Sequence, residues 1–312
     1  MLAFYKNNEF ILEKLDEAAP NCWINAVNPT PEEKDFICSL EIPLDFLTYS
    51  LDIDERSRIE EEDSGTMLIV VRVPYYHGEK VDIPYVTIPL GIILTEKYIV
   101  TVCSQDTDII QTFASGKVAK LSTTKRYRFA LRLLMMATVK FLDDVRAINK
   151  VVDGLEDKLY ASMQNTELLN LLKYQKSYVY FSQALKQNEL TLVRLSRLKS
   201  FQKYEEDEDL LEDVITENTQ AIDMTNISSS ILASLMDAFA SVISNNLNVV
   251  MKILASVTII MSIPNIVTGF FGMNVNFPEV ISAHPLAALI ILILVISMII
   301  ISVLLFQKRN WF

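Results

Sequence analysis

Residues 247–271, LNVVMKILASVTIIMSIPNIVTGFF, and residues 285–306, PLAALIILILVISMIIISVLLF, are two long apolar stretches near the C-terminus. No charged residue lies between Lys252 and Glu279, and none lies between Glu279 and Lys308. A helix needs roughly 20 residues to cross the ~30 Å hydrocarbon core of a bilayer, and each stretch is long enough. The sequence therefore predicts a membrane protein with two spans that follow a large, mostly polar N-terminal part.

The connection between the two spans, GMNVNFPEVISAH, contains neither Lys nor Arg. Lys252 lies at the start of the first span, and Lys308 and Arg309 follow the second. Because positive residues favour the cytosolic side, we expect the connection outside and both termini in the cytosol. The first 17 residues lack the apolar core of a signal peptide. This pattern predicts a multi-pass protein of the cell membrane, that is, the inner or plasma membrane.

The charge of the chain narrows the classes of partner. The formal net charge is −11 over 312 residues, which argues against nucleic acid, because phosphate backbones require clustered Lys and Arg. The cysteines form no CxxC pair and are expected to be reduced and buried, and the two histidines stand alone. A hard cation bound by oxygen fits this composition better than a metal bound by Cys and His. The cysteines are Cys22, Cys38 and Cys103.

No pattern typical of an enzyme is present. The sequence shows no Ser-His-Asp, Cys-His or Gly-rich phosphate constellation, so we expect neither an enzyme nor an organic cofactor. The adjacent carboxylates Asp143 and Asp144 do not face one another on a helix, which indicates a solvated surface.

Residues 1–124 have the pattern of a mixed α/β domain. Thr30, Pro31 and Glu33 match a helix start with a capping box. A second short helix is expected at Thr107–Ala114. β-Branched and apolar segments bounded by turn residues predict strands at Cys22–Val27, Met67–Val73, Tyr85–Pro89, Gly91–Thr95 and Tyr98–Cys103.

The chain becomes helical after about residue 125, because no Pro occurs between Pro89 and Pro264. Apolar spacing predicts an antiparallel helical hairpin, and the acidic run 205–209 suits the start of a third helix that continues into the first span. The predicted fold class is an α+β cytosolic domain, a long-helix bundle and two C-terminal transmembrane helices. The expected parts are residues 1–124 (α/β domain), 125–204 (hairpin), 205–246 (stalk helix), 247–271 (first span), 272–284 (extracytoplasmic loop), 285–306 (second span) and 307–312 (basic cytosolic tail).

One side of the first span carries polar and small residues, which we call the polar stripe. At 100° per residue they fall within a sector of roughly 100°, and the opposite side is aliphatic. Only Ser256 and Thr268 depart from this segregation. Lipid cannot satisfy such a stripe, so it must face water or other protein. The polar stripe consists of Asn248, Met251, Ala255, Thr258, Ser262, Asn265 and Gly269.

Two interpretations of the polar stripe remain. Small residues permit close helix packing, whereas Asn248 and Asn265 favour a water-filled conduit, because packing rarely needs primary amides. Two spans cannot enclose a pore, so a conduit requires several copies of the chain, and the second span would then face lipid. The same face continues upstream through Thr219, Asp223, Asn226, Ser230, Asp237, Ser241 and Ser244. It is either a solvated stalk surface or a cytosolic vestibule in which Asp237 forms a carboxylate ring at the membrane entrance.

The chain resembles the CorA family of divalent-cation transporters over essentially its whole length, strongly after residue 240 and loosely before it. The resemblance rests on Gly272-Met273-Asn274 at the end of the first span, the two terminal spans, and the basic-aromatic end 308–311. Trp23-Ile24 and the following helix start also resemble the first strand and helix of the family. The resemblance implies a homopentameric funnel in the lipid bilayer, whose ligands are divalent cations.

The resemblance also implies roles for individual residues. Asn274 corresponds to the family's asparagine ring at the outer mouth, with Gly272 allowing the turn, Met273 supporting it and Glu279 drawing cations in. Asp237, Asn248 and Met251 correspond to entrance and pore positions. Asp213 and Asp63 are the candidate intersubunit sites for regulatory Mg²⁺. The pore-lining set expected from the stripe and the resemblance is Asp237, Ser241, Ser244, Asn248, Met251, Ala255, Thr258, Ser262, Asn265 and Gly269.

The chain departs from the family pattern at two places. Asn265 stands where the family often has Thr, which bears on ion preference. The loop has one carboxylate, Glu279, which weakens electrostatic attraction. The expected function is a channel that admits Mg²⁺, with Co²⁺ or Ni²⁺ as further ions, and that closes when intracellular Mg²⁺ binds. The alternatives are a zinc transporter of the related Gly-Met-Asn group and a two-span cation sensor that does not conduct.

Overall fold

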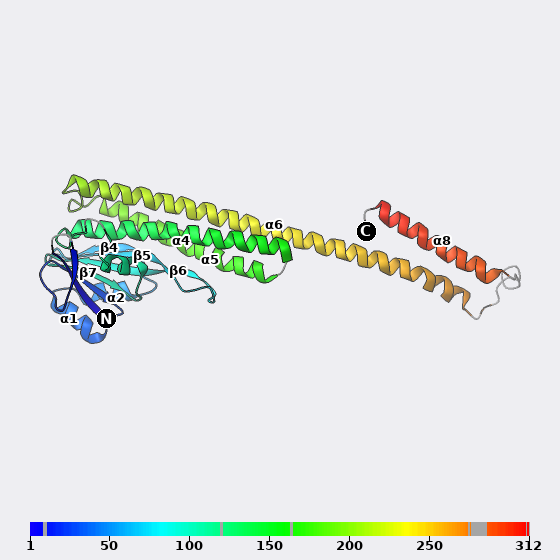
Figure 1. Cartoon of the computed structure of the whole chain (residues 1–312), viewed down its shortest axis with the longest axis horizontal. Coiled ribbons are helices and arrows are strands. Elements are labelled where there is room, and N and C mark those ends of the chain that lie inside the picture. The colour runs from blue at the N-terminus through cyan, green and yellow to red at the C-terminus, as the bar shows by residue number, and fades with distance from the viewer. Residues whose placement is uncertain are drawn as a thin grey trace. The chain divides into compact units, whose positions relative to one another are not determined.

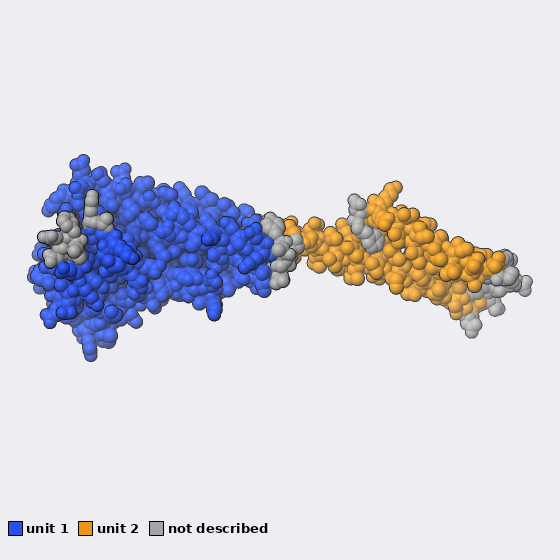
Figure 2. Space-filling model, in the orientation of Figure 1, with its two compact units in different colours: residues 1–234 blue, residues 235–312 orange. Residues whose placement is uncertain are grey.

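The computed structural model describes residues 1–8, 11–118, 121–162, 165–273, 275, 286–309 and 311. The chain contains an α/β sheet domain and long helices (Figure 1). It divides into two compact units, Met1–Ser234 and Leu235–Phe312 (Figure 2). The division falls inside helix α6, Glu205–Phe271, so this one helix contributes to both units.

The first unit contains a seven-stranded sheet with the order β2-β1-β3-β7-β6-β5-β4. Strands β3 and β7 are parallel, and every other neighbouring pair is antiparallel. The strands are β1 (Leu2–Asn8), β2 (Ile11–Leu15), β3 (Cys22–Val27), β4 (Arg58–Glu61), β5 (Met67–Tyr76), β6 (Tyr85–Leu94) and β7 (Tyr98–Cys103).

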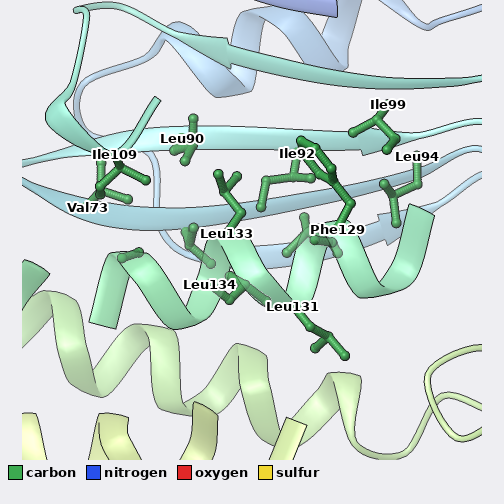
Figure 3. Packing of buried hydrophobic residues seen from close by; sticks show 14 of the residues in the cluster. Val73, Leu90, Ile92, Leu94, Ile99, Ile109, Phe129, Leu131, Leu133 and Leu134 are labelled. Atoms are coloured by element: carbon green, nitrogen blue, oxygen red, sulfur yellow. The ribbon is translucent and has the colours of Figure 1, made fainter. Parts of the chain in front are cut away.

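Helices cover both faces of the sheet, which explains why its central strands are almost continuously apolar. Helices α1 (Pro31–Ser39) and α2 (Leu44–Leu51) bury Ile37, Phe46 and Leu47 on one face. Helices α3 (Asp108–Ala114) and α4 (Arg126–Ser162) pack on the other, where Phe129 and Leu133 reach Leu90 and Ile92 of the sheet (Figure 3).

A buried polar relay joins the two parallel strands. The indole nitrogen of Trp23 on β3 donates to the hydroxyl of Thr101 on β7 at 2.8 Å. That hydroxyl donates in turn to the side-chain oxygen of Asn25 at 3.0 Å. Each buried polar group therefore has a partner, which removes the cost of desolvation and fixes the register of β3 against β7.

Several local predictions are confirmed. The capping box of α1 is present, with the Glu33 amide donating to Thr30 and the Thr30 amide donating to Glu33. Strands start at Cys22, Met67 and Tyr98 as expected. The segments predicted as two strands, 85–89 and 91–95, form the single strand β6. Strands β1, β2 and β4 and helix α2 had no counterpart in the prediction.

Three long helices complete the first unit. The start of α4 is tied to the start of α6 by Arg128, whose guanidinium donates to the carboxylates of Glu206 and Asp207. This pairing satisfies Asp207, which is only 4% exposed. Helix α5 spans Asn165–Leu195, and α6 extends for 67 residues. Helix α8 (Ala287–Lys308) belongs to the second unit.

The contact between β6 and α2 depends on Gly91. A Cβ at Gly91 would lie 1.8 Å from the hydroxyl oxygen and 2.5 Å from the Cβ of Ser50, a fully buried residue of α2. We expect Gly91→Ala to lower the free energy of unfolding of this unit by about 1–3 kcal/mol, because α2 must shift. Gly154→Ala is the matched control, since nothing lies within 4 Å of its Cβ position on α4. Thermal unfolding of the two variants measures the difference, and equal melting temperatures would contradict the close contact.

Candidate ion pathway

The second unit consists of the later part of α6 and of α8, and one face of each helix is covered. Ser256 on α6 is fully buried, and Val295 on α8 is 8% exposed. Half-buried residues recur around both at three- and four-residue spacing, as expected for two packed helices. This packed face consists of Ser256, Ile260, Ile263, Pro264, Val267 and Phe271 on α6, and of Ile291, Val295, Ile299, Ser302 and Phe306 on α8.

The packed face explains one departure from the expected pattern. Ser256 had broken the segregation of polar and aliphatic residues on the first span. Ser256 lies on the covered side of α6, where a small side chain suits helix packing, and its hydroxyl donates to the Lys252 carbonyl at 2.8 Å. The second span, expected to face lipid, is also covered on one side, around Val295.

The polar stripe lies on the side of α6 that faces away from α8. At 100° per residue, its centre is roughly 160° from the centre of the packed face. Six of its seven residues are exposed, and Ser262 is half-buried. Met251, for example, is 54% exposed. The aliphatic side chains Val250 and Met261, which lie on neither face, are 60% and 66% exposed.

Hydrogen bonding singles out the two asparagines of the polar stripe. The hydroxyls of Thr258 and Ser262 donate to the carbonyls of Leu254 and Thr258, at 2.8 and 2.7 Å, so the helix itself satisfies them. Among the residues that the structure describes, no hydrogen-bond partner reaches the side-chain amides of Asn248 and Asn265. A bare amide is costly in hydrocarbon, so these two residues require water or another protein surface.

Helix α6 continues past Pro264 to Phe271. Proline has no backbone N–H to donate to the carbonyl four residues earlier, which is that of Ile260. The hydroxyl of Thr268 donates to the Pro264 carbonyl at 2.7 Å, which accounts for the second departure from the segregation. Pro264 and Ile260 both lie on the packed face, so the weakened turn is on the half-buried side of the helix.

The end of α6 shows why residue 272 is glycine. The Gly272 amide donates to the Thr268 carbonyl at 2.8 Å, and a Cβ at Gly272 would lie 2.9 Å from that oxygen. The turn therefore needs a residue without a side chain because of close approach to the backbone. Met273 follows with 54% of its surface exposed. Asn274 and Glu279 lie outside the described residues.

Upstream of the span, the candidate entrance residues Asp237, Ser241 and Ser244 are exposed. The equivalent face in the first unit is only partly free. The hydroxyl of Ser182 on α5 donates to the side-chain oxygen of Asn226 at 2.9 Å. Asn226 was expected on a continuous solvated face, and it instead lies at the edge of that face, against α5.

The candidate regulatory residues Asp213 and Asp63 are exposed, on α6 and in the turn before β5. Within the described part of the chain, no three His, Cys, Asp or Glu side chains are grouped so that they could hold a metal ion. A site at Asp213 or Asp63 would therefore need ligands from water or from another subunit, which suits a weakly bound, hydrated cation.

The prediction for Asp143 and Asp144 is half wrong. Asp143 is exposed and pairs with Arg146 at 3.0 Å. Asp144 is 5% exposed and forms an ion pair with Lys140 at 3.1 Å. Lys140 also forms an ion pair with Asp108 on α3 at 2.9 Å. Burial raises the pKa of the Asp144 carboxyl to about 6, while Lys140 acts in the opposite direction. Lys140 thus links α4 to α3, with Asp144 as its buried partner on α4.

Comparison with known proteins fits this geometry. The family model for the CorA-like Mg²⁺ transporter protein matches residues 19–309, and so covers both units. The chain belongs to this family. CorA membership together with two apolar helices, Glu205–Phe271 and Ala288–Lys308 within the described residues, makes the chain a membrane protein of a transporter family.

Similar CorA proteins extend over the whole chain. A cobalt/magnesium transport protein CorA from Methanocaldococcus jannaschii is 27% identical over 325 residues, covering 100% of this chain and 99% of the relative. The complete structure of the CorA magnesium transporter from that organism matches with a TM-score of 0.85 and 25% identity, covering 100% and 99% of the two chains. The ZntB cytoplasmic domain from Vibrio parahaemolyticus shares the fold at 10% identity, with a TM-score of 0.61 and coverage of 78% and 98%.

Proposed function

We propose that this CorA chain conducts divalent cations, with Mg²⁺ as the main ion and Co²⁺ or Ni²⁺ as further ions, into the cytosol. The pathway runs along the polar stripe of α6 in a homopentamer. The observation that carries this proposal is that two sides of α6 differ in the second unit, one covered and the other polar and exposed. One face of α6 is covered, while Asn248 and Asn265, whose amides have no hydrogen-bond partner among the described residues, are exposed on the other side of the helix.

Several copies are required because one α6 and one α8 cannot surround water. In a ring, the polar stripes would face the axis and the exposed aliphatic residues would face lipid or neighbouring helices. Residues 247–271 then line the pore, residues 272–284 form its outer mouth, and Asp237, Ser241 and Ser244 line the cytosolic entrance. The lack of Lys and Arg in the connecting loop favours termini in the cytosol.

Hard-ion chemistry explains why amides, rather than carboxylates, suit the narrow part of this pathway. Mg²⁺ releases its water reluctantly, and a charged cage would bind it too tightly for passage. Neutral amide oxygens of Asn274, Asn265 and Asn248 would contact the hydrated ion instead. An inside-negative potential supplies about 2.3 kcal/mol per unit charge per 100 mV, and twice that for a divalent ion.

Ion uptake by the reconstituted protein tests the function. In proteoliposomes with a negative interior potential, we expect saturable uptake of labelled Mg²⁺ that an excess of Co²⁺ inhibits and that needs no proton gradient. Uptake of Zn²⁺ in preference to Mg²⁺, driven by a proton gradient, would instead assign the chain to zinc transport. If none of the three ions is taken up, the alternative of a cation sensor that does not conduct would be favoured.

Feedback by intracellular Mg²⁺ is the regulatory part of the proposal. A Mg²⁺ ion bound by Asp213, with Asp63 of a neighbouring subunit as the second candidate ligand, would hold the pore closed. We expect Asp213→Asn to raise the internal Mg²⁺ concentration that halves uptake by at least about tenfold, because one charged ligand of a weak site is lost. Asp209→Asn on the same exposed run of α6 is the control. Equal Mg²⁺ sensitivity of the two variants would show that Asp213 does not bind the regulatory Mg²⁺.

A further inference from the structure

A pocket of about 290 Å³ lies where the loops before α4 and before α6 meet in the first unit. Its lining is unusual in a chain with a net charge of −11, because half of the lining residues are Lys or Arg. The proposed transport function uses none of them. The pocket is lined by Thr124, Lys125, Arg126, Tyr127, Arg128, Lys203, Tyr204 and Asp207.

Three of the four cations have no carboxylate partner within the part of the chain that the structure describes. Arg128 is occupied by Glu206 and Asp207, and so it neutralises Asp207, which is the one acidic group of the lining. No described carboxylate forms an ion pair with Lys125, Arg126 or Lys203. Within the lining, these three side chains leave an excess of positive charge that favours an anion, while the other carboxylates of the acidic run 205–209 adjoin the pocket without lining it.

The start of α4 adds to this excess. Lys125 occupies the cap position, since its carbonyl accepts the Phe129 amide at 2.9 Å, and the first turn contains no acidic residue. No described group accepts from the backbone N–H of residues 126–128. Cations at the positive end of a 37-residue helix oppose its dipole, whereas α1 of the same chain begins with a complete capping box. An anion in the pocket would satisfy both the helix end and the side chains.

The aromatic residues give the pocket a flat wall. Tyr127 is held edge-on by the buried Phe201, with ring centroids 5.0 Å apart. Tyr204 is 57% exposed, and the Lys203 ammonium lies over its ring, 5.7 Å from the centroid. A ring beside a cationic cluster can stack on a planar group that is attached to an anion.

We propose that this pocket binds an oligophosphate, either the triphosphate of a nucleotide or an inorganic chain of the same length. Three unpaired cations match the several charges of an oligophosphate better than the single charge of a carboxylate. The volume admits a short phosphate chain. The inference does not depend on the proposed transport function.

Calorimetric titration of the purified full-length chain in detergent, with EDTA present to remove divalent cations, tests the proposal. The probes are tripolyphosphate and ATP. We expect micromolar binding that weakens as salt is added. The double variant Arg126→Gln, Lys203→Gln should weaken binding of both probes at least about tenfold, since two charge-assisted contacts are lost.

The matched control is Lys150→Gln, Lys186→Gln, which removes two exposed positive charges outside the pocket and should change the affinity less than about twofold. Tyr204→Ala separates the two sources. If Tyr204→Ala loses affinity for ATP alone, the ligand of the pocket is a nucleotide. If its affinity for both probes is unchanged, the ligand is an inorganic oligophosphate. An absence of saturable binding, or equal binding by both double variants, overturns the site.

Discussion

Asn274→Ala is expected to abolish divalent-cation uptake. Residue 274 follows the glycine turn that ends α6, so the outer mouth of the proposed pore would present one amide from each subunit. The amide oxygen replaces an outer contact of the hydrated ion without competing for its inner water, and alanine offers no such oxygen. We expect Mg²⁺ uptake into proteoliposomes to fall to the level of protein-free vesicles.

Asn276→Ala is the matched control, because it removes the same amide from the same loop two residues later. It should retain most of the uptake. Both variants should elute from a sizing column as the wild type does, which shows that assembly is intact. Uptake that persists in Asn274→Ala would show that conduction does not need this amide. Equal loss of uptake in both variants would show that the effect is not specific to Asn274.

Local signals in the sequence predicted much of the sheet domain, and the failures have physical causes. Pro89 was taken as the end of a strand, but β6 continues through it. Pairing of β6 with β7 begins at Leu90, so Pro89 lies where β6 has only β5 as a neighbour and a missing N–H is tolerated. Strands β1 and β2 form one edge of the sheet, where polar residues such as Lys6 and Glu13 hide the alternation.

Burial set by tertiary contacts is the part that periodicity could not supply. Asp144 and Asp143 are adjacent and chemically identical, yet only Asp144 faces the core, because Lys140 and α3 meet it there. Asn226 has the helical spacing of a solvated face but is close enough to α5 to accept from Ser182. Each outcome depends on which neighbour covers the residue, and a single helix pattern does not contain that information.

The polar stripe shows the opposite case, in which the pattern correctly separated the faces of a helix. Its residues lie away from α8, and the two exceptions, Ser256 and Thr268, are satisfied by backbone carbonyls of α6. Packing by small residues, which was one of the two interpretations of the stripe, is found at Ser256 on the other side of the helix. The conduit interpretation therefore needs its own test.

Ala255→Phe places a large apolar ring on the polar stripe. In a symmetric ring of subunits, every copy would add a phenyl group to the axis of the proposed pore. Apolar constrictions exclude water and stop ion flow even where the backbone is unchanged. We expect Mg²⁺ uptake to fall by at least about tenfold, because the hydrated ion cannot pass a dry constriction without losing water that Mg²⁺ holds tightly.

Val257→Phe adds a ring at the same depth on the opposite side of α6, where Val257 is 47% exposed. Two residues along a helix turn the side chain by about 200°, so this ring would point towards lipid rather than the pore axis. We expect uptake close to that of the wild type. If both variants conduct equally, the stripe does not line the pathway. If Val257→Phe alone blocks, the aliphatic side of α6 faces the axis and the proposed orientation of the helix is reversed.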